Sequence, residues 1–135
     1  MERISVTGAQ KILEVKNTCI DGARFVCAAL NNAYFEDVSL AGTKIKDANL
    51  SGLEIEYAQL GGAYIHNIGM PPKGHPAYNP DAKQRPLKFE DCNLNNSVIS
   101  NCNLEGVSIT DCNITGMTIN GILIDDLLKK YQEIK

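Results

Sequence analysis

The stretch that decides the fold is Ala48-Asn49-Leu50-Ser51-Gly52-Leu53-Glu54-Ile55-Glu56-Tyr57. It holds two successive five-residue units, each centred on a large apolar residue, Leu50 or Ile55. The spacing extends in both directions, breaks once and resumes in a new register. Nineteen positions qualify as centres, and all are large and apolar: Val15, Ile20, Phe25, Leu30, Phe35, Leu40, Ile45, Leu50, Ile55, Leu60, Ile65, Phe89, Leu94, Ile99, Leu104, Ile109, Ile114, Ile119 and Ile124.

The positions around each centre follow the same period. The residue two before it is a second candidate for the interior, and the residue two after it is Gly, Asn or Asp in seventeen of nineteen units. Cys27 and Tyr57 are the exceptions. Because Gly, Asn and Asp best tolerate positive φ, each unit is predicted to end in a sharp corner. Four corners return the chain to its start, so about twenty residues are predicted to form one square coil that stacks on the next.

Units such as Ala48-Asn49-Leu50-Ser51-Gly52 resemble those of the pentapeptide-repeat family, over about residues 13–70 and 87–126. The resemblance implies an all-β fold, a right-handed quadrilateral parallel β-helix, in which the centre and the residue two before it face the interior. The second run departs from the family pattern. Its small inward position is no longer alanine but Cys, Ser, Val, Met or Ile, which predicts a wider or differently packed second stack.

Length and composition favour a single domain spanning residues 1–135. A net charge of −3 gives no electrostatic reason for direct binding to nucleic acid or membrane. The longest apolar runs are too short to span a bilayer, and residues 1–5 lack the layout of a signal peptide. The five cysteines include no Cys-x-x-Cys pair, so we expect a soluble cytoplasmic protein with reduced thiols.

The pattern divides this domain into five segments. Residues 1–12 are predicted to form an N-terminal cap with Ile4, Val6 and Ile12 facing inward. The first stack spans residues 13–68 and the second spans residues 87–124, and a loop at residues 69–86 separates the two stacks. Residues 125–135 are predicted to form a capping helix with Asp125 or Asp126 as N-cap. Its apolar face, and the C-terminal dimerisation that the resemblance implies, predict a homodimer through Leu127, Leu128, Tyr131 and Ile134.

The loop at residues 69–86 contains every proline of the chain and has a local charge of +2. Proline cannot donate to a ladder of backbone hydrogen bonds, so this segment is predicted to leave the stack. Long loops on rigid scaffolds are usually either functional or unstructured. Two interpretations therefore stay open: a loop that contacts a partner, and a tolerated insertion.

No motif in the chain predicts a catalytic, cofactor or metal site. Cys92, Cys102 and Cys112 fall at the small inward position and are predicted to be small buried hydrophobes, whereas Cys19 and Cys27 fall at outward or corner positions. The two histidines, His66 and His75, bracket the start of the loop without any recognisable catalytic order around them, and are predicted to be surface residues.

Sorting the outward residues of the first run by wall separates their charges. One wall carries mainly acidic residues, and the opposite wall is basic. The acidic wall holds Glu14, Lys16, Tyr34, Glu36, Glu54 and Glu56, and the basic wall holds Arg24, Val26, Lys44, Lys46, Tyr64 and His66. Stacked like charges are mildly unfavourable, which favours a functional origin, although so few charges can also segregate by chance.

These features predict a non-catalytic interaction or scaffold module without cofactor or metal, binding an unknown protein partner. The predicted contact residues lie on the loop and the basic wall: Lys73, His75, Tyr78, Arg85, Arg24, Lys44 and Lys46. An alternative follows from the resemblance, a DNA-mimicking protein that binds gyrase, as quinolone-resistance pentapeptide proteins do. A duplex mimic needs a density of negative charge close to that of phosphates, which this weakly acidic chain approaches poorly. An enzyme is not expected, because small apolar interiors leave no cleft for substrate.

Overall fold

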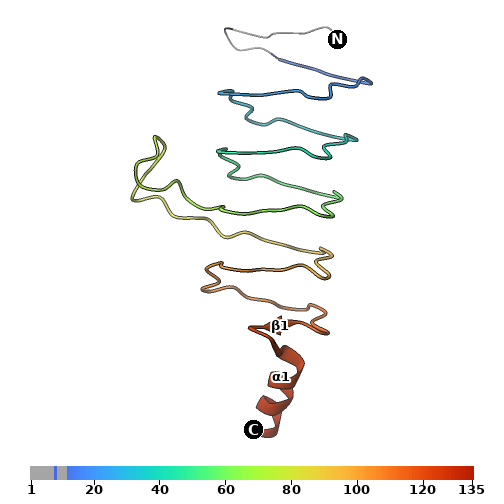
Figure 1. Cartoon of the computed structure of the whole chain (residues 1–135), viewed down its shortest axis with the longest axis vertical. Helices are drawn as coiled ribbons and strands as arrows, with labels where there is room; N and C mark the ends of the chain where they lie inside the picture. Colours follow the sequence, from blue (N-terminus) through green and yellow to red (C-terminus); the bar gives the residue numbers. More distant parts are fainter. Residues whose placement is uncertain (1–7, 9–11) are drawn as a thin grey trace. The chain divides into compact units, whose positions relative to one another are not determined.

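The computed structural model describes Gly8 and residues 12–135. The chain divides into two units, the first ending at Gly61 and the second running from Gly62 to Lys135. Figure 1 traces the five-residue repeats of each unit as short extended segments joined by tight corners. The predicted cap residues Ile4 and Val6 lie outside the described residues. Ile12, predicted to face inward, is 98% exposed.

The predicted corners are present. Eighteen of the nineteen residues that follow a centre by two have positive φ, and Asp126, in the C-terminal helix, is the exception. Cys27 and Tyr57, the two side chains that broke the Gly/Asn/Asp pattern, also adopt this conformation, with φ of 51° and 52°. The period of the repeat therefore fixes the backbone conformation even where the residue type does not favour it.

Corners of two kinds alternate along the chain. At every second corner except that of Gly62, a backbone N–H of the described residues bonds to the carbonyl three residues earlier, as from Leu53 to Leu50 and from Val107 to Leu104, at 3.0 and 3.1 Å. The glycines at these corners have φ of 73–78°, near the +80° of a type II turn. The corners between them lack this bond among the described residues and carry Asn, Asp, Cys or Tyr with φ of 49–55°. The hydrogen-bonded corners thus carry glycine, or asparagine at Asn32 and Asn96, and Gly62 is a glycine corner without the described bond.

Side chains at the centres are about half exposed, from 43% at Val15 to 68% at Ile99, apart from the better covered Ile114 and Ile124. Three of the apolar residues one before a centre, Tyr34, Tyr64 and Val98, are more exposed still, which agrees with the predicted inward and outward alternation, whereas Leu123 is 41% exposed. The predicted buried core is not found: none of the described hydrophobic side chains is buried. Outside the C-terminal hairpin, the described backbone bonds close local turns and include none of the coil-to-coil bonds of a parallel β-helix.

The repeats end in a hairpin. Strands β1 (Thr118–Ile119) and β2 (Ile122–Leu123) pair antiparallel, with Ile119 opposite Ile122. Asn120 and Gly121 connect them with φ of 50° and 81°, and Asn-Gly is the preferred sequence for a two-residue hairpin turn with two positive φ angles. The last corner of the repeat series therefore reverses the chain instead of continuing the coil.

Helix α1 (Ile124–Glu133) follows the hairpin directly and confirms the predicted C-terminal helix. Its N-cap is Leu123, without a side-chain cap, so the prediction of an aspartate N-cap is wrong. Asp125 and Asp126 lie in the first turn instead, where carboxylates still interact favourably with the positive end of the helix dipole. The N-cap is displaced because the strand β2 ends at Leu123 and leaves no linker residue before the helix.

Candidate interaction surface

The proline-rich loop is an ordered series of three β-turns. The N–H of His75 bonds to the carbonyl of Pro72, that of Tyr78 to His75, and that of Ala82 to Asn79, at 3.0, 2.9 and 3.3 Å. The second and third turns carry proline at their second position, where its fixed φ suits the turn. In Figure 1 the loop is the yellow-green excursion that leaves the path of the repeats. The predicted departure of this segment from a stack of coils stays a prediction, because the described backbone bonds join no coil to another.

His75 links the first two turns. It donates its backbone N–H to Pro72, accepts at its carbonyl from Tyr78, and accepts at Nδ1 from the N–H of Ala77 at 3.0 Å. A backbone N–H donates only to a ring nitrogen that carries no proton, so Nδ1 is the acceptor in this turn. His75 is half-buried, so the prediction of a simple surface histidine is incomplete.

Asn79 occupies the equivalent place in the third turn. Its Oδ1 accepts from the N–H of Asp81 at 3.0 Å, while its carbonyl accepts from Ala82. His75-Pro76 and Asn79-Pro80 are therefore two copies of one turn, four residues apart. The same side-chain bond recurs in the repeats, where Asn49, Asn93, Asn103 and Asn113 each accept from the N–H two residues later at 3.0 Å.

Three cations of the loop, Lys73, Lys83 and Arg85, have exposed side chains that make no ion pair or hydrogen bond within the described part of the chain. Elsewhere, Lys16 is held 2.5 Å from Glu14, and Lys88 is paired with Glu90. Tyr78 is 42% exposed. The loop thus presents three positively charged side chains that form no ion pair with a carboxylate of the described residues.

Residues flanking a centre project to the same side. The two ion pairs described above each join residues one before and one after a centre, Val15 or Phe89. The rings of Tyr64 and His66 flank Ile65 in the same way and stack with centroids 4.2 Å apart at 16°. Asn67 Nδ2 lies 3.1 Å from His66 Nδ1. These contacts fit an extended backbone, in which residues i and i+2 share a face.

The remaining predicted contact residues, Arg24, Lys44 and Lys46, lie in the first unit, whereas the loop belongs to the second. All three are exposed and directly flank a centre, Phe25 or Ile45. They have no described ion pair. Their assignment to one basic wall stays a prediction.

All five cysteines are exposed free thiols, so the prediction that Cys92, Cys102 and Cys112 are buried is wrong. Each of these three sits directly after an open bend and points Sγ at the carbonyl oxygen two residues earlier, at 3.1–3.2 Å. They remain exposed because no neighbouring coil covers the side of the chain on which they lie. Their equivalent geometry confirms that they share one position of the repeat.

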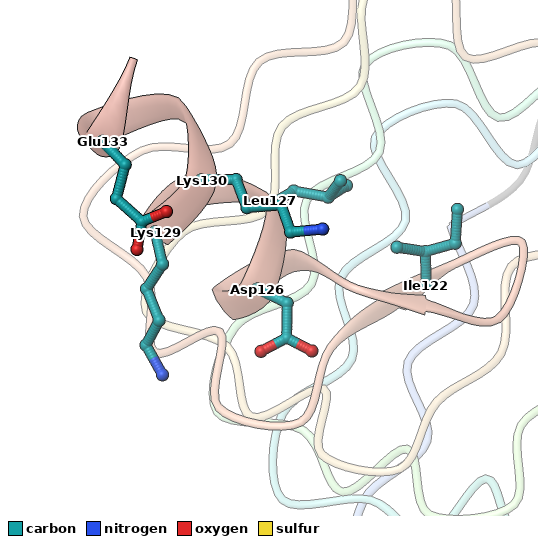
Figure 2. Close-up of a pocket in the computed structure, with 6 residues that line it drawn as sticks. All are labelled: Ile122, Asp126, Leu127, Lys129, Lys130 and Glu133. Carbon is teal, nitrogen blue, oxygen red and sulfur yellow. The ribbon is translucent and has the colours of Figure 1, made fainter. Parts of the chain in front are cut away.

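A surface groove of about 420 Å³ runs beside α1 (Figure 2). Six exposed residues line the groove, of which two are acidic, two are basic and two are apolar: Asp126, Glu133, Lys129, Lys130, Ile122 and Leu127. Within Gly8 and residues 12–135, no three His, Cys, Asp or Glu side chains are grouped as a metal site would require. No helix of the described part is long and apolar enough to cross a membrane.

Comparison with known families identifies the repeats. The model of pentapeptide repeats matches eight copies, at residues 20–52 and 88–122, which together make up about half of the chain. No curated protein and no solved structure is significantly similar to the chain. The matched segments lie on both sides of the loop, so the loop interrupts one repeat family rather than joining two.

Proposed function

Because this chain belongs to the pentapeptide-repeat family, we propose that it is a non-catalytic protein-interaction module whose main contact surface is the loop at residues 69–86. The observation that carries this proposal is the order of the loop. A tolerated insertion has no need of three consecutive hydrogen-bonded turns, whereas a binding loop gains affinity when its bound conformation already exists in the free protein.

The charge of the loop points to an acidic protein surface as partner. Lys73, Lys83 and Arg85 face solvent without described carboxylate partners, and Asp81 is the one acidic side chain of the loop. Tyr78 adds an aromatic ring of the kind enriched at interfaces. A long polyanion such as nucleic acid is disfavoured by the net charge of −3 on the whole chain. Arg24, Lys44 and Lys46 extend the same chemistry in the first unit.

The test is affinity purification from native cells with the full-length chain as bait. A first variant replaces residues 71–86 with a short Gly/Ser linker, and a second carries Lys73→Glu, Lys83→Glu and Arg85→Glu. We expect both variants to lose the specific partners, and we expect the wild-type complex to weaken as ionic strength rises.

A matched control reverses three other cations of the second unit, Lys129→Glu, Lys130→Glu and Lys135→Glu. Its change in net charge is identical, but it falls on α1 and the C-terminus, so it should retain the partners. If the linker variant captures the same partners as the wild type, the loop is not the contact surface. If the control loses them as well, the effect is one of overall charge.

The proposal includes closure of the repeats into a right-handed quadrilateral β-helix. Corners at intervals of five residues, alternating between two kinds, supply the turns that such a coil needs. The half-exposed centres supply the driving force, because complete burial of one large apolar side chain stabilises a fold by about 1.5–3 kcal/mol. The free thiols fit a reducing compartment, and a cytoplasmic location belongs to the same proposal.

Mimicry of DNA toward gyrase is the weaker candidate. Of the residues on the predicted acidic wall, Glu14 is already paired with Lys16. The unpaired loop cations add positive charge on a surface exposed to partners. This distribution is far from the sustained negative charge of a duplex.

A further inference from the structure

The turn between β1 and β2 contains the one Asn-Gly pair of the chain, Asn120-Gly121. We propose that Asn120 is a site of spontaneous covalent modification, at which the native protein loses ammonia and converts this asparagine into a mixture of aspartate and isoaspartate. The site is separate from the proposed contact surface, because it lies in the C-terminal hairpin and not in the loop at residues 69–86.

The modification needs only the two residues of the turn and water. The backbone nitrogen of Gly121 attacks Cγ of Asn120 and gives up its proton, the Cγ–Nδ2 bond breaks, and Nδ2 leaves with that proton as ammonia. A five-membered succinimide ring remains. Water then opens the ring: cleavage of the new bond between nitrogen and Cγ gives aspartate, and cleavage of the bond between the nitrogen and the backbone carbonyl carbon of residue 120 gives isoaspartate.

The backbone nitrogen of Gly121 is open to this reaction. Glycine has no Cβ to hinder the approach of the preceding side chain, and an added Cβ at this residue would meet nothing within 4 Å. The strand pairing ends at Ile119 and Ile122, so the Gly121 nitrogen lies outside the ladder of paired residues. Both residues of the turn are exposed, so water reaches the succinimide directly.

The side-chain amide of Asn120 differs from those of the asparagines in the repeats. Four of them hold Oδ1 against the backbone N–H two residues later at 3.0 Å, and each precedes a large apolar centre, Leu or Ile: Asn49, Asn93, Asn103 and Asn113. Within the described part of the chain, the amide of Asn120 makes no such bond. Its Cγ can therefore rotate toward Gly121 without breaking a hydrogen bond.

The turn that holds the pair is easily opened. Ring closure requires a backbone rotation that the paired strands restrain, and β1 and β2 have only two residues each, none of them buried. A two-stranded hairpin is marginally stable on its own, and exposed elements with few contacts open locally at low free energy. The native protein therefore reaches the reactive conformation without unfolding as a whole.

The isoaspartate product alters the hairpin and the start of α1. Its backbone runs through Cγ and contains an additional methylene group, so the two-residue turn no longer matches the pairing of Thr118 with Leu123. The N–H of Ile124, the first residue of α1, bonds to the carbonyl of Met117 at 3.1 Å, directly beyond that pair. Conversion therefore loosens the attachment of α1 to the repeats.

The experiment incubates the full-length protein in mildly alkaline buffer, which favours loss of the proton from the attacking nitrogen, and follows each asparagine by peptide mass spectrometry. Electron-transfer fragmentation distinguishes isoaspartate from aspartate. We expect Asn120 to convert at least about tenfold faster than Asn103 and Asn113, because its neighbour is unhindered and its turn opens readily. Gly121→Ala keeps the asparagine, adds one methyl group and should slow the conversion roughly tenfold. Since alanine also strains the turn, the same comparison in denaturant isolates the effect of the methyl group.

Freshly prepared Asn120→Asp is the matched control for the product, because it carries the charge of the deamidated side chain on an unaltered backbone. By amide exchange, protection of the Ile124 N–H should fall roughly tenfold in the isoaspartate protein and persist in Asn120→Asp. Conversion of Asn120 no faster than that of Asn103, or conversion only in the denatured chain, would overturn the proposal. Neither readout involves a partner or the loop at residues 69–86, so failure here and failure of the affinity experiment are separate results.

Discussion

Gly61 and Gly62 are neighbours in one corner and differ in backbone conformation. An added Cβ would meet nothing within 4 Å at either residue, but Gly62 has a φ of +76° whereas Gly61 lies outside the positive-φ region. We expect Gly62→Ala to lower the free energy of unfolding by about 1–2 kcal/mol. Gly61→Ala should leave it unchanged or raise it by up to about 1 kcal/mol, since alanine restricts the unfolded chain. Denaturant titration of both variants checks this, and equal effects would contradict it.

Tyr57 is a bulky side chain in a left-handed corner, with a φ of 52° and 98% exposure. Asparagine occupies this conformation at lower cost, so Tyr57→Asn should raise the free energy of unfolding by about 1 kcal/mol. Tyr34→Asn removes another exposed tyrosine, at a position without positive φ, and should give no such gain. A gain of equal size in both variants would attribute the effect to lost aromatic surface.

At this scale the sequence predicted the corners well, because their signal is intrinsic to single residues. Gly, Asn and Asp mark positions where positive φ is inexpensive, and a fixed period extends the prediction to Cys27 and Tyr57. The turn-forming role of His75 was missed, because histidine is not a usual turn residue. The signal was present in the two matching pairs His75-Pro76 and Asn79-Pro80.

Among the elements, α1 was predictable from its apolar spacing, and the hairpin before it was not. Asn120-Gly121 fits the repeat as well as it fits a hairpin turn, so the sequence alone does not separate continuation of the coil from reversal. The hairpin pairs Thr118 with Leu123 and thereby moves the start of the helix to Ile124. The predicted N-cap failed because the preceding element was not foreseen.

Dimerisation through α1 stays a prediction at the scale of this element. Its apolar face, Leu127, Leu128, Tyr131 and Ile134, is exposed, and a second copy would cover it. We expect the wild type to have the mass of a dimer by light scattering and the double variant Leu128→Glu, Ile134→Glu to have that of a monomer. Lys129→Glu with Lys130→Glu, between the apolar positions, is the control and should stay dimeric. A monomeric wild type would contradict the prediction.

For the whole molecule, the sequence identified the repeat family but could not show how the coils pack. Corners are local and follow from single residues, whereas stacking depends on contacts between residues about twenty apart, which the described backbone bonds do not include. The same limit applies to the predicted wall of Arg24, Lys44 and Lys46. That wall exists only if successive coils keep a constant register, so its geometry depends on closure of the stack.

Closure of the coils can be measured with the cysteines. In a closed β-helix, Cys92, Cys102 and Cys112 occupy the inward position and leave solvent, while Cys19 and Cys27 stay outward or at a corner. In variants that retain a single cysteine, we expect an aromatic disulfide reagent to react with the three inward thiols at least about tenfold more slowly than with the other two, because reaction must await local opening. The rates for the denatured variants serve as controls and should be similar. Equal rates for all five native thiols would mean that the coils remain open, in agreement with the exposure of these thiols in the structure. That result would contradict the β-helix but would leave the turns of the loop at residues 69–86 unaffected.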